Sequence, residues 1–415
     1  MAYSTKAKEF YTSELKGMRA SGTFKEERYI QSPQAANIKV EYPLGAAPKE
    51  VINFCANNYL GLSSHPEVVE AAHKGLDTRG YGMSSVRFIC GTQDIHHELE
   101  KKLTEFLGTE DTILFASCMD ANAAIFDVVL DKDDAMIADR LVHASIVDGI
   151  KLCKAQLYNY KHSNMAHLEE KLQEASGCRL RMIITDGVFS MDGDIAKLDK
   201  IVELAEKYEA MILVDDSHAT GFMGKHGRGS HEYYNVVGKI DVITTTLGKA
   251  LGGASGGCVS GRREIVELCR QRARPYLFSN TVPPVIVAAA RKVLDVISIT
   301  TDRRDKLEAN TKYFREKITQ AGFDIKEGVH PIVPIMLYNA KLAQDMAHDL
   351  YGEGIYVIGF SFPVVPKGQA RIRVQISAAH EQEHLDTAIT AFTKIGEKYK
   401  ILGKKKEEII QMYGL

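Results

Sequence analysis

One lysine stands among small residues in the segment TTTLGKALGG at 244–253. A phosphate-binding P-loop needs glycine five residues before its Gly-Lys pair and Ser or Thr directly after it. Ile243 and Ala250 occupy those two positions, so the segment does not predict a P-loop. Two interpretations of Lys249 stay open: an ordinary loop lysine, or a desolvated amine that can form a Schiff base.

A second cluster follows the apolar run at 211–214, which ends in Asp215, Asp216, Ser217 and His218. Adjacent acids at the end of a strand can form a metal site or cap a helix. A carboxylate in this place can also keep a pyridinium nitrogen protonated, so that the ring accepts electrons from a carbanion. His218 could reach a phenolic oxygen of the same ring. Asp216 is expected to be a structural hydrogen-bond acceptor.

Three further segments carry polar groups just after predicted strands. His143 lies at a strand-to-helix turn, where it is either a structural residue or a ring that stacks on a flat cofactor. Ser190 offers a hydroxyl in the glycine-flanked segment 186–193. Cys118 and Met119 lie where a strand meets a helix, whose first backbone N–H groups can bind phosphate. Cys118 is expected to act through its backbone rather than its thiol.

The elements that position these residues alternate along the chain. Short apolar runs at 112–115, 135–138, 182–185, 211–214 and 242–245 alternate with helical patterns near 120–130, 144–153, 165–175 and 197–208. This alternation predicts a mostly parallel sheet with helices on both faces. Ligands bind beyond the carboxyl ends of such strands, where the polar clusters lie.

The N-terminal and C-terminal parts of the chain have different sequence patterns. Helical spacing is expected at 9–19, and Ser64 is expected to cap a helix that Pro66 opens. After residue 284 one long helical stretch to about 321 is predicted, then strands near 332–337, 355–358 and 370–376 and a final helix from 381. The predicted division is an N-terminal segment (1–50), a large α/β domain (51–290) and a small C-terminal α+β domain (291–415).

Composition excludes several classes of protein. The 415 residues are 45% hydrophobic and 26% charged, which is ordinary for a globular chain and unlike a disordered one. A net charge of −2 gives no basic excess for nucleic acid. The seven cysteines are scattered with no Cys-x-x-Cys pair, so no metal site is expected. The sequence has neither a signal-peptide pattern nor an apolar run of membrane-spanning length, so a cytoplasmic location is expected.

Several of these motifs resemble those of a known protein family. The lysine segment, the Asp-Asp-Ser-His strand end and the His-Ala-Ser turn, together with residues 52–62, 85–93, 274–280 and 363–373, are similar to those of the α-oxoamine synthases. The likeness extends from about residue 24 to about residue 395. It implies a pyridoxal 5′-phosphate (PLP) enzyme with the aspartate aminotransferase-like fold (fold type I), in which a large, mostly parallel sheet domain carries a smaller α+β C-terminal domain.

The resemblance implies roles for four catalytic candidates. Lys249 would hold the cofactor covalently and then act as a general base. Asp215 would pair with the pyridine nitrogen and His218 with the 3-oxygen of the ring. His143 would stack on the ring.

The other roles concern the phosphate and the substrates. Cys118, Met119 and Thr246 would hold the phosphate, which Ser279 and Asn280 would reach from the partner subunit of a homodimer. Ser190 would lie beside the ring. Arg373 would bind the amino-acid carboxylate with help from Asn57, and Arg28 would line the acyl-CoA entrance. Arg371 is the alternative carboxylate ligand, because only one of two alternating arginines on a strand faces the site.

The implied activity is the condensation of glycine with acetyl-CoA to 2-amino-3-oxobutanoate and CoA, whose reverse direction would serve threonine breakdown. Residues 88–92 resemble the members of the family that use glycine and acetyl groups. The alternatives are 8-amino-7-oxononanoate synthesis from alanine and a pimeloyl thioester, a dual specificity, the 5-aminolevulinate and serine palmitoyl reactions, an aminotransferase, and a non-catalytic scaffold.

Overall fold

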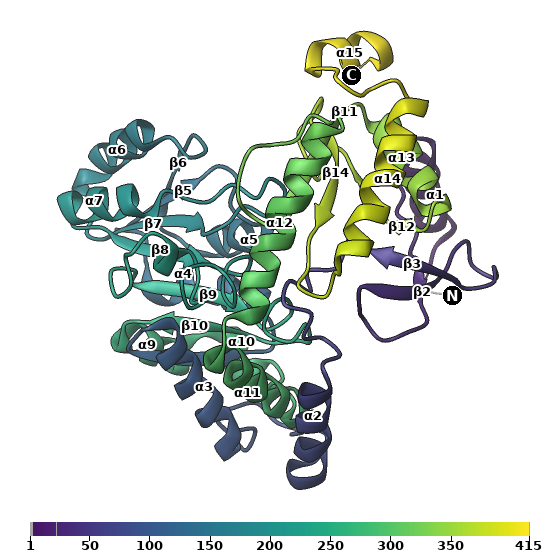
Figure 1. The fold of residues 1–415 in the computed structure, drawn as a ribbon. Coiled ribbons are helices and arrows are strands. Elements are labelled where there is room, and N and C mark those ends of the chain that lie inside the picture. The colour runs from purple at the N-terminus through teal and green to yellow at the C-terminus, as the bar shows by residue number, and fades with distance from the viewer. Residues whose placement is uncertain (1–2, 22, 415) are drawn as a thin grey trace.

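A computed structural model describes residues 3–21 and 23–414 of the chain. Its centre is a seven-stranded sheet in the order β4-β10-β9-β8-β7-β5-β6 (Figure 1). Strand β10 is antiparallel to both neighbours and the remaining pairs are parallel. The strands are β4 (Asp111–Phe115), β5 (Ala135–Asp139), β6 (Gln156–Tyr160), β7 (Arg181–Asp186), β8 (Met211–Asp215), β9 (Val242–Thr246) and β10 (Gly257–Gly261).

Helices cover both faces of this sheet because the strands are apolar on both sides. Met136, Ile184 and Leu213 pack on one face with α4, α5 and α9, whereas Ile137 and Ile212 pack on the other with α6 and α7. The helices of this region are α3 (Asp94–Leu107), α4 (Cys118–Val129), α5 (Ala144–Leu152), α6 (Met165–Glu174), α7 (Leu198–Tyr208), α8 (Ser230–Tyr233), α9 (Arg263–Arg272) and α10 (Arg274–Phe278). The predicted layout of alternating strands and helices is confirmed.

Two local predictions are wrong. Helix α2 (Pro66–Arg79) has His65 as its N-cap rather than Ser64, with no side-chain capping hydrogen bond. The single helix expected after residue 284 is two helices, α11 (Pro284–Ile299) and α12 (Asp302–Gln320). The Thr300 hydroxyl accepts a hydrogen bond from the Asp302 N–H, so a new helix begins there.

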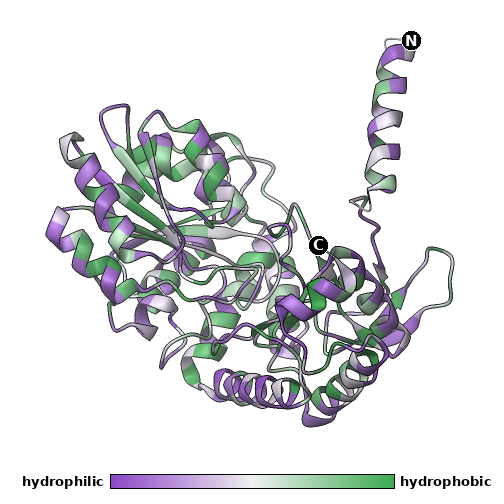
Figure 2. Cartoon of the chain, turned by 90° about the horizontal axis from the view of Figure 1, so that it is seen from above, coloured by the Kyte–Doolittle hydropathy of each residue, from purple (hydrophilic) through white to green (hydrophobic). Residues whose placement is uncertain are grey.

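The C-terminal lobe holds a three-stranded sheet, β11-β14-β13, and shares a second sheet, β1-β2-β3-β12, with the N-terminal segment. Helix α1 projects from the body, and each of its residues is at least partly exposed (Figure 2). The elements are α1 (Thr5–Ala20), β1 (Tyr29–Ile30), β2 (Asn37–Glu41), β3 (Lys49–Asn53), β11 (Ile332–Tyr338), α13 (Ala340–Gly352), β12 (Ile355–Tyr356), β13 (Gly359–Phe360), β14 (Ala370–Gln375), α14 (Gln382–Lys398) and α15 (Lys406–Tyr413). No helix within residues 3–21 and 23–414 is long and apolar enough to cross a membrane.

Candidate active site

A cavity of about 250 Å³ lies at the carboxyl ends of the central strands. Asp186 ends β7, Asp215 ends β8 and Thr246 ends β9, so parallel pairing brings the three strand ends to one edge of the sheet. The lining residues are Ser117, Cys118, Met119, His143, Ser145, Asp186, Val188, Asp215, Ser217, His218, Thr246, Gly248 and Lys249. The structure thus brings together seven of the predicted site residues: Cys118, Met119, His143, Asp215, His218, Thr246 and Lys249.

Both carboxylate oxygens of Asp215 are held by hydrogen bonds. Asn122 Nδ2 donates to Oδ2 over 2.6 Å, and the Ser217 N–H donates to Oδ1 over 3.0 Å. Asp215 is only 6% exposed. Its neighbour Asp216 is buried and accepts from the Ser230 and Thr220 hydroxyls, which is the structural role expected for it.

Lys249 is partly buried, and it lines the cavity together with Asp215. Burial lowers the pKa of the Lys249 amine, which favours the neutral form that a nucleophile or base requires. Burial and the charge of Asp215 together hold the pKa of Asp186 well above its usual value. Burial likewise raises the pKa of the Cys118 thiol, which disfavours a thiolate there.

His143 is the N-cap of α5 and stays exposed in this chain. Its backbone N–H donates to Asp186 Oδ1 over 3.0 Å, and its Nδ1 lies 2.7 Å from the Ser145 hydroxyl. Desolvation by the surrounding protein lowers the pKa of the His143 imidazole. The ring is therefore neutral, anchored at Nδ1 and accessible, as a stacking role requires.

His218 is buried and fixed at two points. Its Nδ1 lies 2.8 Å from the Tyr59 hydroxyl, and its carbonyl oxygen accepts a hydrogen bond from His330 Nε2. Burial, followed by the charges of Lys249 and Arg373, lowers the pKa of His218 well below its usual value. The side chain therefore enters the cavity as a neutral imidazole.

The two arginines of β14 have different environments. Arg371 is 1% exposed and donates to Asp192 Oδ1 and to the Met191 carbonyl, so its charge is paired within the fold. Arg373 donates from Nη1 to the Ser190 carbonyl, but its Nε is buried with no partner in the described chain. This arrangement favours Arg373 over Arg371 as a ligand for an incoming carboxylate.

Arg373 is not among the residues that line this cavity, and three further predicted residues also lie outside the lining. Asn57 accepts from Gln375 Nε2, two residues beyond Arg373 on the same strand. Ser190 lines a neighbouring cavity and contributes its carbonyl to Arg373. Arg28 packs against the rings of Tyr42, Tyr351 and Tyr356 at 4.8–5.0 Å and donates to the Val357 carbonyl.

Ser279 and Asn280 follow α10 and do not line the cavity of their own chain. Asn280 is exposed, and exposed apolar residues accompany the pair: Phe278 is 69% exposed and Ile89 is 68% exposed. Asn280, Phe278 and Ile89 therefore lie at the surface of this chain.

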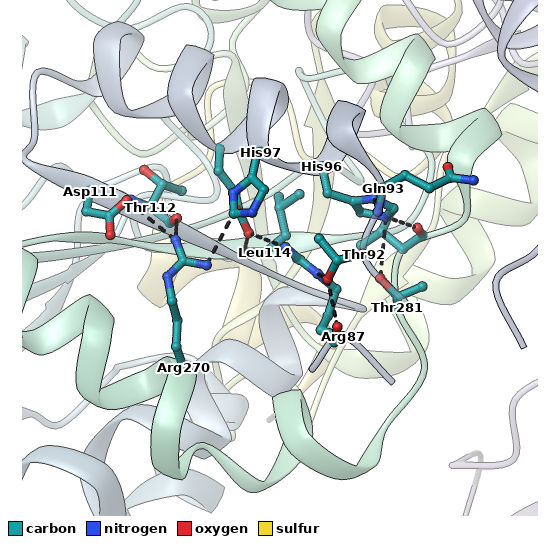
Figure 3. A network of polar contacts seen from close by, with 12 residues as sticks. Arg87, Thr92, Gln93, His96, His97, Asp111, Thr112, Leu114, Arg270 and Thr281 are labelled. Carbon is teal, nitrogen blue, oxygen red and sulfur yellow. Dashed lines mark hydrogen bonds and ion pairs between the residues drawn. The ribbon is translucent and has the colours of Figure 1, made fainter. Parts of the chain in front are cut away.

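A buried polar network supports this exposed region (Figure 3). Arg87, which precedes Phe88 and Ile89, pairs with buried Glu100 at 2.9 Å and lies over the Tyr276 ring of α10. Arg270 and His97 also pair with Glu100. His96 Nε2 bonds to the Val282 carbonyl, close behind Ser279 and Asn280 in the sequence. The network therefore connects residues 87–89 and the segment after α10 to α3.

The residues present fit PLP. A partly buried amine and a fixed carboxylate share one cavity, which suits an aldehyde and a pyridine nitrogen on opposite sides of a ring. The first turn of the 12-residue helix α4 also opens into this cavity through Cys118 and Met119, and free N–H groups at a helix N-terminus suit a phosphate.

Two functional residues were not identified from the sequence. Tyr59 and Asn122 fix His218 and Asp215 across 159 and 93 residues of chain, respectively. For Asn122 one signal existed, because it lies four residues after Cys118 and so occupies the same face of one helix.

Comparisons with known proteins agree with this geometry. The model for aminotransferases of class I and II matches residues 49–392. A 2-amino-3-ketobutyrate coenzyme A ligase of Escherichia coli K12 is 55% identical over 95% of this chain and 99% of that protein. The mitochondrial 2-amino-3-ketobutyrate coenzyme A ligase of Homo sapiens is 53% identical over 94% of this chain and 92% of that protein.

Solved structures show the same fold. A serine palmitoyltransferase of Sphingomonas wittichii has a TM-score of 0.88 at 27% identity and covers 94% of this chain and 98% of its own. An SPT structure with PLP has a TM-score of 0.87 at 28% identity with the same coverage. The expected fold type I architecture is confirmed. The chain therefore belongs to the aminotransferase class I and II family, in its α-oxoamine synthase group with the 2-amino-3-ketobutyrate coenzyme A ligases.

Proposed function

We propose that the chain is a PLP-dependent acyltransferase that condenses glycine with acetyl-CoA to give 2-amino-3-oxobutanoate and CoA. The observation that carries this proposal is the shared cavity of Lys249 and Asp215, flanked by the partly unpaired guanidinium of Arg373. The two ligases that are 53–55% identical over nearly the whole chain support the choice of substrates.

Each cavity residue then has a task in holding the cofactor. The N–H groups at Cys118 and Met119, with the Thr246 hydroxyl, bind the phosphate. Asp215 pairs with the pyridine nitrogen, His218 with the 3-oxygen, and the exposed ring of His143 stacks on the cofactor. When bound, PLP supplies an electron-withdrawing ring that stabilises negative charge at the amino-acid Cα.

The chain's own groups bind the substrate and move its proton. Arg373 binds the glycine carboxylate with help from Asn57, whose amide oxygen accepts a hydrogen bond from Gln375, two residues after Arg373 on β14. The neutral amine of Lys249 takes the proton from the glycine Cα, which the lowered pKa of Lys249 favours. Ser190 lies beside the ring, and Arg28 lines the acyl-CoA entrance.

Four finer features belong to the same proposal. The enzyme is a homodimer in which Ser279 and Asn280 reach the partner's phosphate site. It serves threonine breakdown in the reverse direction, and it works in the cytoplasm. The chain divides into the segment 1–50, a large domain at 51–290 and a small domain at 291–415.

A thiol-release assay with purified holoenzyme tests this function. Glycine with acetyl-CoA should release CoA fastest in a panel that includes alanine, serine, and pimeloyl, succinyl and palmitoyl thioesters. Lys249→Ala should abolish release, whereas Lys225→Ala, at an exposed lysine, should not change it. Faster release with alanine and a pimeloyl thioester would favour the alternative, since an 8-amino-7-oxononanoate synthase of Thermosipho melanesiensis is 42% identical over 94% of this chain.

A further inference from the structure

Asn122 lies at the centre of the hydrogen bonds behind the cavity. Its side chain is fully buried on α4, on the side of the helix that meets the strand ends. Nδ2 donates to Asp215 Oδ2 over 2.6 Å and to the Ser145 hydroxyl over 2.9 Å. One amide group therefore supplies both of its hydrogens to two different elements of the site.

The other end of this amide has its own partner. The Thr244 hydroxyl on β9 donates to Asn122 Oδ1 over 2.8 Å. A hydroxyl can donate or accept, but a carboxylate oxygen only accepts, so Asp215 requires the NH₂ group of Asn122 on its side and leaves the carbonyl oxygen facing Thr244. The buried amide is satisfied on both ends, as a fully connected polar network requires.

The hydrogen bond from Asn122 to Ser145 continues through Ser145 to the ring of His143. The Ser145 N–H donates to His143 Nδ1, so Nδ1 is an acceptor in the neutral ring. The Ser145 hydroxyl accepts from Asn122 and lies 2.7 Å from the same Nδ1, to which it can donate. This direction of donation places the ring proton of His143 on Nε2.

Close packing of α4 and α5 makes the hydrogen bond between Asn122 and Ser145 possible. At Gly149, one turn after Ser145 on α5, a Cβ atom would lie 2.3 Å from the backbone oxygen of Asn122. Glycine therefore lets α5 approach α4 at the level of Asn122. The contact brings the Ser145 hydroxyl within reach of the Asn122 side chain.

We propose that Asn122 is a positioning residue that holds the carboxylate of Asp215 and, through Ser145, the ring of His143 as one unit. The proposal rests on the proposed function, in which Asp215 pairs with the pyridine nitrogen and His143 stacks on the ring. A hydrogen bond to a charged group is worth about 1.5–3 kcal/mol, which corresponds to roughly ten- to a hundredfold in an equilibrium constant. Loss of the unit should therefore appear in cofactor binding itself.

The test compares three alanine variants of the full-length enzyme. For each we would measure the dissociation constant of PLP from the apoenzyme, the pH midpoint of the holoenzyme's visible absorbance, and the melting temperature of the apoenzyme. Asn122→Ala should weaken PLP binding roughly ten- to a hundredfold and shift the absorbance midpoint. Ser145→Ala should give a smaller change of the same kind, because it removes only the hydroxyl that links Asn122 to His143.

Asn310→Ala is the matched control. Asn310 is a buried asparagine whose Nδ2 donates to the Ser377 and His380 carbonyls, far along the chain from the cavity residues. It should lower the melting temperature as Asn122→Ala does, but leave PLP affinity and the absorbance midpoint as in the wild type. This separates positioning from a general loss of stability.

The outcomes are distinguishable from a failure of the proposed function. A wild-type enzyme with no visible PLP absorbance would overturn the proposed function. A wild type that binds PLP, with Asn122→Ala or Ser145→Ala unchanged in affinity and in absorbance midpoint, would overturn the positioning role. If Asn122→Ala does not fold, the PLP affinity and absorbance midpoint of Ser145→Ala decide whether the positioning role holds. Coupling is further shown if the double variant loses less affinity than the two single losses combined.

Discussion

The hydroxyl of Tyr59 lies 2.8 Å from Nδ1 of His218 in the buried wall of the cavity. Burial raises the pKa of the Tyr59 phenol and lowers the pKa of His218, so both groups are neutral near pH 7. With Tyr59 as the donor, His218 keeps its own proton on Nε2. A buried phenol thus selects the imidazole tautomer that can donate to a ligand from Nε2.

Removal of that hydroxyl tests the tautomer. We expect Tyr59→Phe to lower kcat/KM roughly tenfold and the free energy of unfolding by about 1–3 kcal/mol, because Nδ1 is left buried without a partner. The phenyl ring keeps its packing on Phe222, at 4.6 Å between ring centroids. The checks are thiol-release kinetics and urea unfolding. Wild-type kinetics in a destabilised variant would show that Tyr59 acts on the fold alone.

Arg373 and Arg371 form a matched pair for the second prediction. Arg373→Lys should raise KM for glycine roughly tenfold or more, since an ammonium cannot replace two parallel hydrogen bonds to a carboxylate. Arg371→Lys should instead lower the melting temperature and leave KM nearly unchanged, because Arg371 is paired with Asp192 inside the fold. Substrate titrations and thermal unfolding measure both. An exchange of the two phenotypes would assign the carboxylate to Arg371.

The sequence predicted the central strands well, because strands buried on both faces read as continuous apolar runs. It did not predict β10, whose residues Gly257–Gly261 are small and fully buried, nor β6, an edge strand that is mostly exposed. At Gly257 a Cβ atom would lie 2.3 Å from the Cys118 nitrogen. The composition of β10 therefore reflects close packing, which periodicity does not report.

The residues of the site also divide into those that the sequence predicted and those that it did not. Asp215 ends a strand, and Lys249, His218 and His143 each follow one, so topology alone places them at one edge of the sheet. Tyr59 and Asn122 depend on contacts between distant segments, and their local sequence has no chemical signature of that role. The choice between Arg371 and Arg373 likewise needed the position of Asp192, 179 residues away from Arg371.

A shared active site gives the third prediction. Ser279→Asp, which places a carboxylate where a phosphate should bind, and Lys249→Ala should each be nearly inactive as homodimers. In a mixed dimer, one site combines an intact Lys249 with an intact Ser279 from the other chain. Equal mixing by co-refolding should therefore restore about a quarter of wild-type CoA release, since half of the dimers are mixed and each has one intact site.

The control for that experiment is to mix two variants altered at the same position, which leaves no intact site. Light scattering should show one dimeric mass for all samples. Mixed dimers that stay inactive would mean that Ser279 serves the site of its own chain.

The network around Glu100 gives the last prediction, which concerns acid stability (Figure 3). Burial alone would raise the pKa of Glu100, but the hydrogen bond from His97 and the charges of Arg87 and Arg270 outweigh it and lower the pKa to about 2. A carboxyl whose folded pKa lies below its unfolded value of about 4.5 stabilises the fold above pH 4.5. On the order of 3 kcal/mol should be lost as the pH falls from 4.5 to 2.

His97→Ala should make this loss begin at a higher pH. The Glu100 pairing raises the pKa of His97, so this histidine stabilises the fold below about pH 6.5, and its contribution disappears as the pH rises through its folded pKa. The variant should therefore be less stable than the wild type at pH 5 and nearly equal to it at pH 9, as measured by urea unfolding across pH. His73→Ala, at an exposed histidine on α2, should follow the wild type throughout. A pH-independent deficit in His97→Ala would mean that His97 contributes packing rather than charge.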